Sequence, residues 1–347
     1  MTLPSPTRST QTRPPQARPP RVVLYIGLIG TVAVLFGLSL MAGRVWVPFQ
    51  VWLSPLSGGA TDPRWAIIFE LRLPRAILGV IVGAALGLSG AALQGYTRNP
   101  LADPGVLGVS SMAALGAVIA LYYGLSVVSP WMLPVAAMTG ALAGVGALML
   151  LSGGGSSLVA FVLAGAILNI IASAGVSLAL SLAPNPWAVA EIVSWLMGSL
   201  ADRSFEEVRL ALPFMIIGGG LLLATGRALD ALTLGETGAR SLGVSMTRTR
   251  WLLTLGVGLA AGARVAVTGV IGFVGLVTPH LLRPLVGARP GALLLPSAIG
   301  GAAVVLAADI LVRLTPAAVE VRLGVAMAIL GAPFFLLLLL RLRRGLA

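Results

Sequence analysis

Few side chains in this sequence could take part in chemistry, and their types narrow what that chemistry could be. The chain has no cysteine, a single histidine (His280) and no lysine, because all 23 basic residues are arginine. These absences exclude disulfides, thiolate nucleophiles, a histidine–cysteine zinc site and the phosphate-binding lysine of a P-loop. We therefore expect no protein-bound metal or cofactor, and another chain must bind any ATP and Mg²⁺ that this protein uses.

Among the ionisable side chains in or next to long apolar segments, where a charge is expected to have a partner or a function, are two at the end of one segment, whereas Arg264 lies inside another. Asp309 and Arg313 are four residues apart, and the favoured interpretation is that they neutralise each other. An ion or proton relay through Asp309 is the alternative. His280 follows Pro279, and we interpret it as a hydrogen-bonded packing residue in preference to a haem or metal ligand.

Three polar side chains recur every four residues between positions 157 and 181. Asn169, Ser173 and Ser177 would therefore lie on one stripe of a helix. Such a stripe can face a water-filled pathway, or it can hydrogen-bond to its own backbone or to a neighbouring helix. Both interpretations remain open.

A long polar break runs from position 227 to position 250. Within it, Glu236 and Arg240 are four residues apart with the acid first, the favoured orientation of an ion pair on a helix. Gly243 then suits a helix end. The pattern predicts a short helix at the membrane surface; a solvated connector is the alternative.

The elements that must position these residues follow from the composition. Hydrophobic residues make up 57% of the 347 residues, 44 others are glycine, and only 10% are charged. A soluble fold cannot bury that much apolar surface, so we predict an all-α integral membrane protein. The net charge of +12 does not indicate nucleic-acid binding, because the arginines lie in short loops between apolar runs.

Ten apolar segments are long enough, at about 1.5 Å per residue, to cross most of a hydrocarbon core about 30 Å thick. Residues 1–21 are rich in Pro, Ser, Thr and Arg, which predicts a disordered tail before one transmembrane domain over 22–347. Two adjacent spans are divided near Thr268. The predicted spans are 22–41, 76–95, 105–124, 131–151, 157–181, 208–226, 251–267, 268–287, 292–312 and 323–340.

The distribution of arginine orients these spans. Both ends of the chain carry several arginines and no acid, so both termini are expected in the cytoplasm, which requires an even number of spans. With ten spans, the loops and tails on the predicted inner side hold more arginines than those on the outer side. The predicted location is therefore a membrane, with multiple passes and both termini inside.

Glycines recur at helix-packing intervals in the second and eighth spans. Small residues three or four apart let helix backbones approach closely in a bilayer. We interpret these glycines mainly as packing contacts; room for a permeating solute or for sliding helices is the alternative. They are Gly83, Gly87 and Gly90, and Gly269, Gly272 and Gly275.

Five local motifs are more specific than the composition. Two frame tight connections: QGYTRNPLADPG at 94–105 and GVIGFVGLVTPH at 269–280. The others are RLPR at 72–75, LGE followed by ARSLG between 234 and 243, and GAPFF at 331–335. In this order, from about residue 22 to residue 344, the sequence closely resembles the FecCD family, the membrane subunits (permeases) of bacterial ABC importers for iron–siderophore, haem and cobalamin.

The resemblance implies partners and site residues. It implies a homodimer around one pathway in the cytoplasmic membrane, two cytoplasmic ATPase subunits, an external solute-binding protein, and a pseudo-twofold relation between spans two to five and seven to ten. It also implies a coupling helix for the ATPase, outer arginines that dock the binding protein, and a path along the fifth span. These residues are Leu234, Gly235, Glu236, Ala239, Arg240, Leu242 and Gly243 (coupling), Arg72, Arg75 and Arg313 (docking), and Asn169, Ser173 and Ser177 (path).

Several alternatives accompany this interpretation. The docking arginines could instead anchor lipid headgroups. Arg322 stands where the family often has proline and Phe205 where tryptophan is common, which bears on the fit of the binding protein. A secondary transporter would need intramembrane carboxylates, for which Asp309 is the candidate, and an intramembrane enzyme would need a nucleophile and a base. Siderophore, haem and cobalamin, in that order, are the expected substrates.

Overall fold

The computed structural model describes residues 20–43, 45–48, 50–53, 64–153, 157–287, 289–315 and 321–344. Within these ranges the chain forms helices and no β-strand, which confirms the prediction of an all-α membrane protein. The predicted tail 1–21 lies outside the described residues up to position 19, and Arg21 already begins the first helix.

Each predicted span coincides with a helix. Among the described residues, seven helical segments are long and apolar enough to cross a membrane, and three apolar helices are shorter, namely α5, α14 and the apolar part of α16. The helices in question are α1 (Arg21–Met41), α4 (Leu73–Thr97), α5 (Val109–Tyr122), α7 (Met132–Leu151), α8 (Leu158–Ser181), α10 (Phe205–Ala224), α13 (Met246–Thr268), α14 (Val274–Val286), α15 (Pro290–Arg313) and α16 (Leu323–Arg344).

Short helices connect the long ones at both ends of the bundle. Sequence patterns predict only the helical segment within 227–250, which the structure divides into α11 and α12. These connecting elements are α2 (Gln50–Leu53), α3 (Arg64–Ala66), the π-helix η2 (Ile67–Arg72), the 3₁₀-helix η3 (Pro104–Leu107), α6 (Leu125–Val128), α9 (Pro186–Leu196), α11 (Gly226–Leu232) and α12 (Gly235–Ser241).

The predicted third and eighth spans are too long, because backbone breaks delay both helices. Before α5 the chain forms η3 and then turns at Gly108, whose φ is 74°. Between α13 and α14 it turns at Gly269 (φ 69°) and Phe273 (φ 66°). A Cβ atom at Gly269 would lie 2.2 Å from the carbonyl oxygen of Trp195, so the break also requires glycine there. The predicted boundary at Thr268 is indeed a helix end.

The centre of the bundle is formed by α4, which packs closely on α15. A Cβ atom at Gly87 would lie 1.9 Å from the carbonyl oxygen of Ser297, and one at Gly83 would lie 2.4 Å from that of Gly301. Gly90 meets the backbone of α14 in the same way. These contacts confirm the packing interpretation; Gly272 is the exception, since a Cβ atom there would meet no neighbour within 4 Å.

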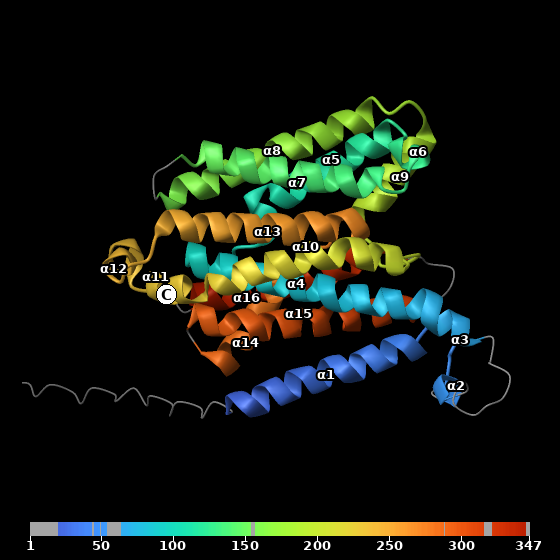
Figure 1. Ribbon diagram of the computed structural model, residues 1–347, viewed down its shortest axis with the longest axis horizontal. Coiled ribbons are helices and arrows are strands. Elements are labelled where there is room, and N and C mark those ends of the chain that lie inside the picture. Colours follow the sequence, from blue (N-terminus) through green and yellow to red (C-terminus); the bar gives the residue numbers. More distant parts are fainter. Residues whose placement is uncertain are drawn as a thin grey trace, which may run out of the picture.

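Figure 1 shows how the helices are layered. The central helices α4 and α13 are the most buried, whereas α1 lies on one flank and α5, α7 and α8 lie on the other. At one end of the bundle lie α11, α12 and the first residues of α1. At the opposite end lie α2, α3, α6 and α9. The predicted coupling and docking residues are therefore at opposite ends.

Candidate functional site

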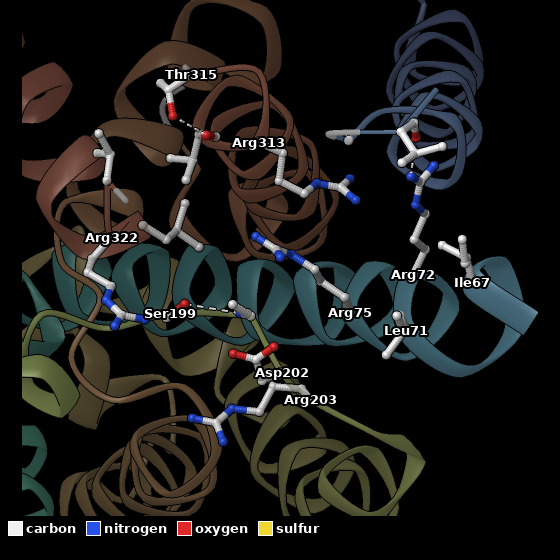
Figure 2. Close-up of a pocket in the computed structure, with 16 residues that line it drawn as sticks. Ile67, Leu71, Arg72, Arg75, Ser199, Asp202, Arg203, Arg313, Thr315 and Arg322 are labelled. Carbon is white, nitrogen blue, oxygen red and sulfur yellow. Dashed lines mark hydrogen bonds between the residues drawn. The ribbon is translucent and has the colours of Figure 1, made fainter. Parts of the chain in front are cut away.

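Five arginines line one cavity of about 480 Å³ at the end of the bundle opposite α12. Figure 2 shows that these side chains come from different elements: Arg75 and Arg313 lie beside each other, whereas Arg72 points toward the end of α1. The three predicted docking residues are thus brought to one place, together with two arginines that are not among the predicted docking residues. The five are Arg72, Arg75, Arg203, Arg313 and Arg322.

Asp309 holds two of these arginines in a buried ion cluster. The Arg75 guanidinium donates bidentately to its carboxylate, from Nη2 at 2.8 Å and from Nε at 3.0 Å. Arg313 Nε lies 3.2 Å from the second carboxylate oxygen, and only 1% of the Asp309 side chain is exposed. The predicted pair of Asp309 with Arg313 is confirmed, but the bidentate partner is Arg75 on α4.

The Arg72 guanidinium donates its hydrogen bonds at the C-terminal end of α1. Its Nη1 donates to the carbonyl oxygens of Leu40 (3.0 Å) and Met41 (2.8 Å), and its Nη2 donates to that of Val45. The last carbonyls of a helix have no partner within the helix, so a buried guanidinium satisfies and neutralises this end. Arg72 is 7% exposed, and its role as a docking residue stays a prediction.

Arg203 and Arg322 complete the cavity wall. Arg203 Nη1 lies 3.9 Å from a carboxylate oxygen of Glu207, and Arg322 Nη2 donates to the Ser194 hydroxyl at 3.0 Å. Burial lowers the pKa of Arg203, an effect that the nearby Glu207 and Asp202 oppose. The signal that could have found Arg322 is its departure from the proline that is frequent in the family.

The cavity carries an excess of positive charge. Its walls hold five guanidinium groups and the carboxylate of Asp202, with Asp309 buried beside them. Arg72 and Arg75 repel each other, and Arg313 is repelled by both. Guanidinium groups bind carboxylates and phosphates through paired hydrogen bonds. The cavity is therefore suited to an acidic group from outside the chain.

The two glycine-containing motifs that frame tight connections meet near the α12 end of the bundle. Gln94 on α4 donates through Nε2 to the carbonyl oxygens of Gly275 (3.4 Å) and Leu276 (3.3 Å). Its Oε1 accepts a 2.9 Å hydrogen bond from Arg283 on α14. Because Gly90 also touches Gly275, side-chain and backbone contacts join α4 to α14.

Another buried arginine lies on α13, next to the backbone turns that precede α5 and α14. Arg264 on α13 is 3% exposed and donates to the Ile271 carbonyl oxygen (3.0 Å) and the Ser110 hydroxyl (3.2 Å). Burial raises the pKa of the neighbouring Asp103, whereas the Gly105 N–H and the charge of Arg264 lower it. The sequence interpretation assigned neither residue a role, although a charge within the seventh span was a signal.

The end of α12 is fixed by its backbone. Gly243, with φ 81°, donates its N–H to the Arg240 carbonyl at 2.9 Å, and the next N–H reaches the Ala239 carbonyl at 3.0 Å. This Schellman motif confirms the predicted helix and its end at Gly243. Leu234 and Leu242, at its two ends, are 68% and 64% exposed.

The expected ion pair on α12 is absent from the described part of the chain. Glu236 and Arg240 lie near opposite ends of this seven-residue helix, and their carboxylate and guanidinium form no salt bridge. Exposed ion pairs contribute only about 0–1 kcal/mol, which is too little to hold two long side chains together. Arg240 instead lines a cavity beside α13.

The polar stripe of α8 lies on the flank of the bundle. Asn169 is half-buried and accepts a 2.5 Å hydrogen bond from Ser111 on α5, whereas Ser173 and Ser177 are exposed. Asn169 therefore bonds a neighbouring helix, one of the two interpretations. The other two hydroxyls lie on a surface that also exposes Ile170 and Leu178.

His280 packs its ring edge against Phe334, with ring centroids 5.8 Å apart. Among the residues that the structure describes, no three His, Cys, Asp or Glu side chains gather as metal ligands would. The site is therefore characterised by arginine and backbone contacts.

Comparisons with known proteins agree with this architecture. The model of the FecCD transport family matches residues 31–341. The vitamin B12 import system permease protein BtuC of Vibrio cholerae is 39% identical over 92% of this chain and 93% of its own length. The Fe(3+) dicitrate transport system permease protein FecD of Escherichia coli is 38% identical over 88% of this chain and 94% of its own.

One solved structure has the same fold. It is described as an inward-facing conformation of a metal-chelate type ABC transporter, and it superposes with a TM-score of 0.81. The identity is 32%, with 92% of this chain and 99% of that chain covered. The similarity therefore extends over nearly the whole fold.

Proposed function

Because this chain belongs to the FecCD transport family of ABC importer permeases, we propose that it forms, as a homodimer, the membrane path of an importer whose ATPase and solute-binding subunits are separate chains. ATP and Mg²⁺ would be bound by the ATPase subunits. The chain itself would catalyse no covalent step, as is usual for a permease subunit.

The observation that carries this proposal is the exposed apolar surface of α12. Leu234 and Leu242 flank a short helix with a well-defined end, and both side chains are more than 60% exposed, so they are available to contact a protein partner. A cleft in the ATPase is the partner that the family supplies. We place this end of the bundle, with both termini, in the cytoplasm because the arginine distribution favours it.

A movement of α12 would reach the membrane helices through α11. Asp230 on α11 accepts a 2.8 Å hydrogen bond from the N–H of Gly291 in the first turn of α15. Close backbone contacts at Gly83 and Gly87 join α15 to α4, and the hydrogen bonds of Gln94 join α4 to α14. ATP binding on the partner would thus tilt packed helices together and open the path alternately to each side.

The path would lie at the contact between two copies of the chain. Ser173 and Ser177 support this, because hydroxyl groups on an exposed helix surface are better placed facing water than lipid; Asn169, on the same stripe, bonds α5. The solute would be a metal chelate. We keep the order iron–siderophore, haem, cobalamin, and selectivity would reside mainly in the binding protein.

The arginine cavity at the outer end would receive acidic side chains of the binding protein. Its excess positive charge supports this role, and Arg75, with 17% of its side chain exposed, is the best placed of the three proposed docking residues. Arg72 and Arg313 would contribute mainly by their charge, since both are more deeply buried.

Reconstitution with an ATPase and a binding protein tests the proposed function. We expect ATP-dependent uptake of a ferric chelate into proteoliposomes that persists when ionophores collapse the ion gradients. Replacing Leu234 and Leu242 with serine should reduce uptake at least about tenfold, because their apolar surface would no longer hold the ATPase. Uptake of radioactive iron and copurification of the ATPase measure the effect.

The control is Leu182→Ser, which changes a leucine that is 60% exposed at the opposite end of the bundle and should leave uptake unchanged. Uptake that needs an ion gradient and no ATPase would instead identify a secondary transporter. Normal coupling in the Leu234 and Leu242 variant would show that α12 is not the ATPase contact.

A second prediction concerns Arg75. Arg75→Gln should weaken binding of the solute-binding protein about tenfold at low salt and less at high salt, where screening already reduces the attraction. We expect this variant to fold, because the Asp309 carboxylate still forms its ion pair with Arg313. Surface plasmon resonance on the permease in nanodiscs measures the affinity, with the exposed Arg209→Gln as the matched control. An affinity unchanged by Arg75→Gln would remove this cavity from docking.

A further inference from the structure

A second cavity, of about 780 Å³, lies between the end of α7 and the start of α13, next to α12. One part of its wall is apolar and is formed by Met149, Leu150, Met246 and Trp251. We call it the α7–α13 cavity. Of the residues that line it, only Arg240 belongs to the expected coupling residues.

The rest of this wall is basic and polar. Arg240 from the end of α12 and Arg250 from the first turns of α13 both line the cavity, as does Thr247. Arg250 is held in place because its Nε donates to the Tyr96 hydroxyl at 3.2 Å and its guanidinium lies 5.7 Å from the Phe161 ring centroid. The cavity thus has a fixed positive charge at its base and a second, exposed one at its rim.

The surroundings place this cavity at the level of the lipid headgroups. Leu150 is 83% exposed and Leu151 is 54% exposed on the last turn of α7, so lipid chains must reach that height. Trp251 is 43% exposed, and tryptophan is enriched where a membrane meets water. Arg240 lies one step further out, on the surface helix.

We propose that the α7–α13 cavity binds an anionic phospholipid, with the phosphate between Arg240 and Arg250 and an acyl chain along the apolar wall. Charge complementarity selects the headgroup. Two guanidinium groups can pair with the phosphodiester of either kind of lipid, but the cationic group of a zwitterionic headgroup offsets this attraction, whereas an anionic headgroup has no such cation. The start of a long helix, α13, adds a favourable dipole at the same place.

The consequence is a contact between lipid and the coupling helix. Arg240 belongs to α12, so a lipid bound between Arg240 and Arg250 would connect α12 to α7 and α13. The inference goes beyond the proposed transport function, since neither the solute nor the direction of transport enters it. An acidic segment of the ATPase is the competing occupant.

Trp251 provides a direct probe. It is the tryptophan near α12, whereas three of the other six precede α4, one lies just after α6 and two lie in α9, elements at the opposite end of the bundle. The full chain is placed in nanodiscs that contain phosphatidylglycerol brominated on the acyl chain, or equally brominated phosphatidylcholine. The difference in quenching between the wild type and Trp251→Phe isolates this residue, and soluble phosphate carries no quencher.

We expect the anionic lipid to half-quench Trp251 at about a fivefold lower mole fraction than the zwitterionic lipid. Arg240→Gln should abolish this preference, whereas Arg289→Gln, an exposed arginine at the same end but outside the cavity, should retain it. Gly146→Leu should fill the cavity and reduce quenching by both lipids, since its Cβ meets open space. Gly220→Leu, also into open space on α10, is its control.

Three results would overturn the proposal. The first is equal quenching by both lipids, and the second is a preference that survives both Arg240→Gln and Gly146→Leu. The third is loss of anionic quenching when the ATPase subunit is added, which would assign the cavity to that protein. Because the measurement needs no transport, its failure leaves the proposed importer function untouched.

Discussion

Asp309→Asn is expected to lower the free energy of unfolding by about 3 kcal/mol, because it leaves two partly buried guanidinium groups without their carboxylate. Asp309 is 1% exposed and bonds Arg75 bidentately, with Arg313 3.2 Å away on the other oxygen. An amide of the same size keeps the packing but not the charge. Denaturant titration of the purified permease measures the change.

Two further variants separate charge from packing. Glu206→Gln makes the same carboxylate-to-amide change on an exposed side chain at the same end of the bundle and should cost less than about 0.5 kcal/mol. Adding Arg75→Gln to Asp309→Asn should recover part of the loss, since one unpaired charge is removed. A wild-type stability in Asp309→Asn would mean that the cluster is not a charged one.

Gly87→Leu is expected to prevent correct folding, with a loss of about 3 kcal/mol or more. A Cβ atom at Gly87 would lie 1.9 Å from the carbonyl oxygen of Ser297, so α4 and α15 would have to separate along their whole contact. Overpacking against flexible side chains costs about 1–3 kcal/mol, and a backbone atom cannot rotate away as a side chain can. Yield and thermal unfolding after size-exclusion chromatography report the loss.

Gly220→Leu provides the comparison on another helix of the bundle. A Cβ atom at Gly220 meets nothing within 4 Å, and leucine has the higher helix propensity. This variant should therefore be as stable as the wild type. Equal yields of the two variants would show that the close approach of α4 and α15 is not required.

The positions of the helices could be predicted because apolar length alone determines them in a bilayer. The shorter lengths of α5 and α14 could not be predicted from the sequence. Their late starts depend on turns at Gly108 and Gly269, and the latter is fixed by the carbonyl of Trp195, which is distant in the sequence. Local composition, which is apolar on both sides of each turn, contains no sign of such a tertiary contact.

The sequence predicts at which end of the bundle the arginine site lies, but not which partner each arginine bonds. The arginine distribution puts Arg72, Arg75 and Arg313 at one end of the bundle, and helical spacing pairs Arg313 with Asp309. The bidentate partner of Asp309 is 234 residues away, and Arg72 serves the end of α1. Both contacts depend on which helices are neighbours, which no spacing within one helix can reveal.

The short lengths of α5 and α14 have a consequence for biogenesis. The 13 residues of α14 contain two prolines and Arg283, so this segment is a poor substrate for independent insertion by the translocon. In the folded bundle α14 packs against α4 and α15, and α5 packs against α7 and α8. We therefore expect each short helix to become stable in the bilayer only when these packing partners, and not merely the helix before it, are in place.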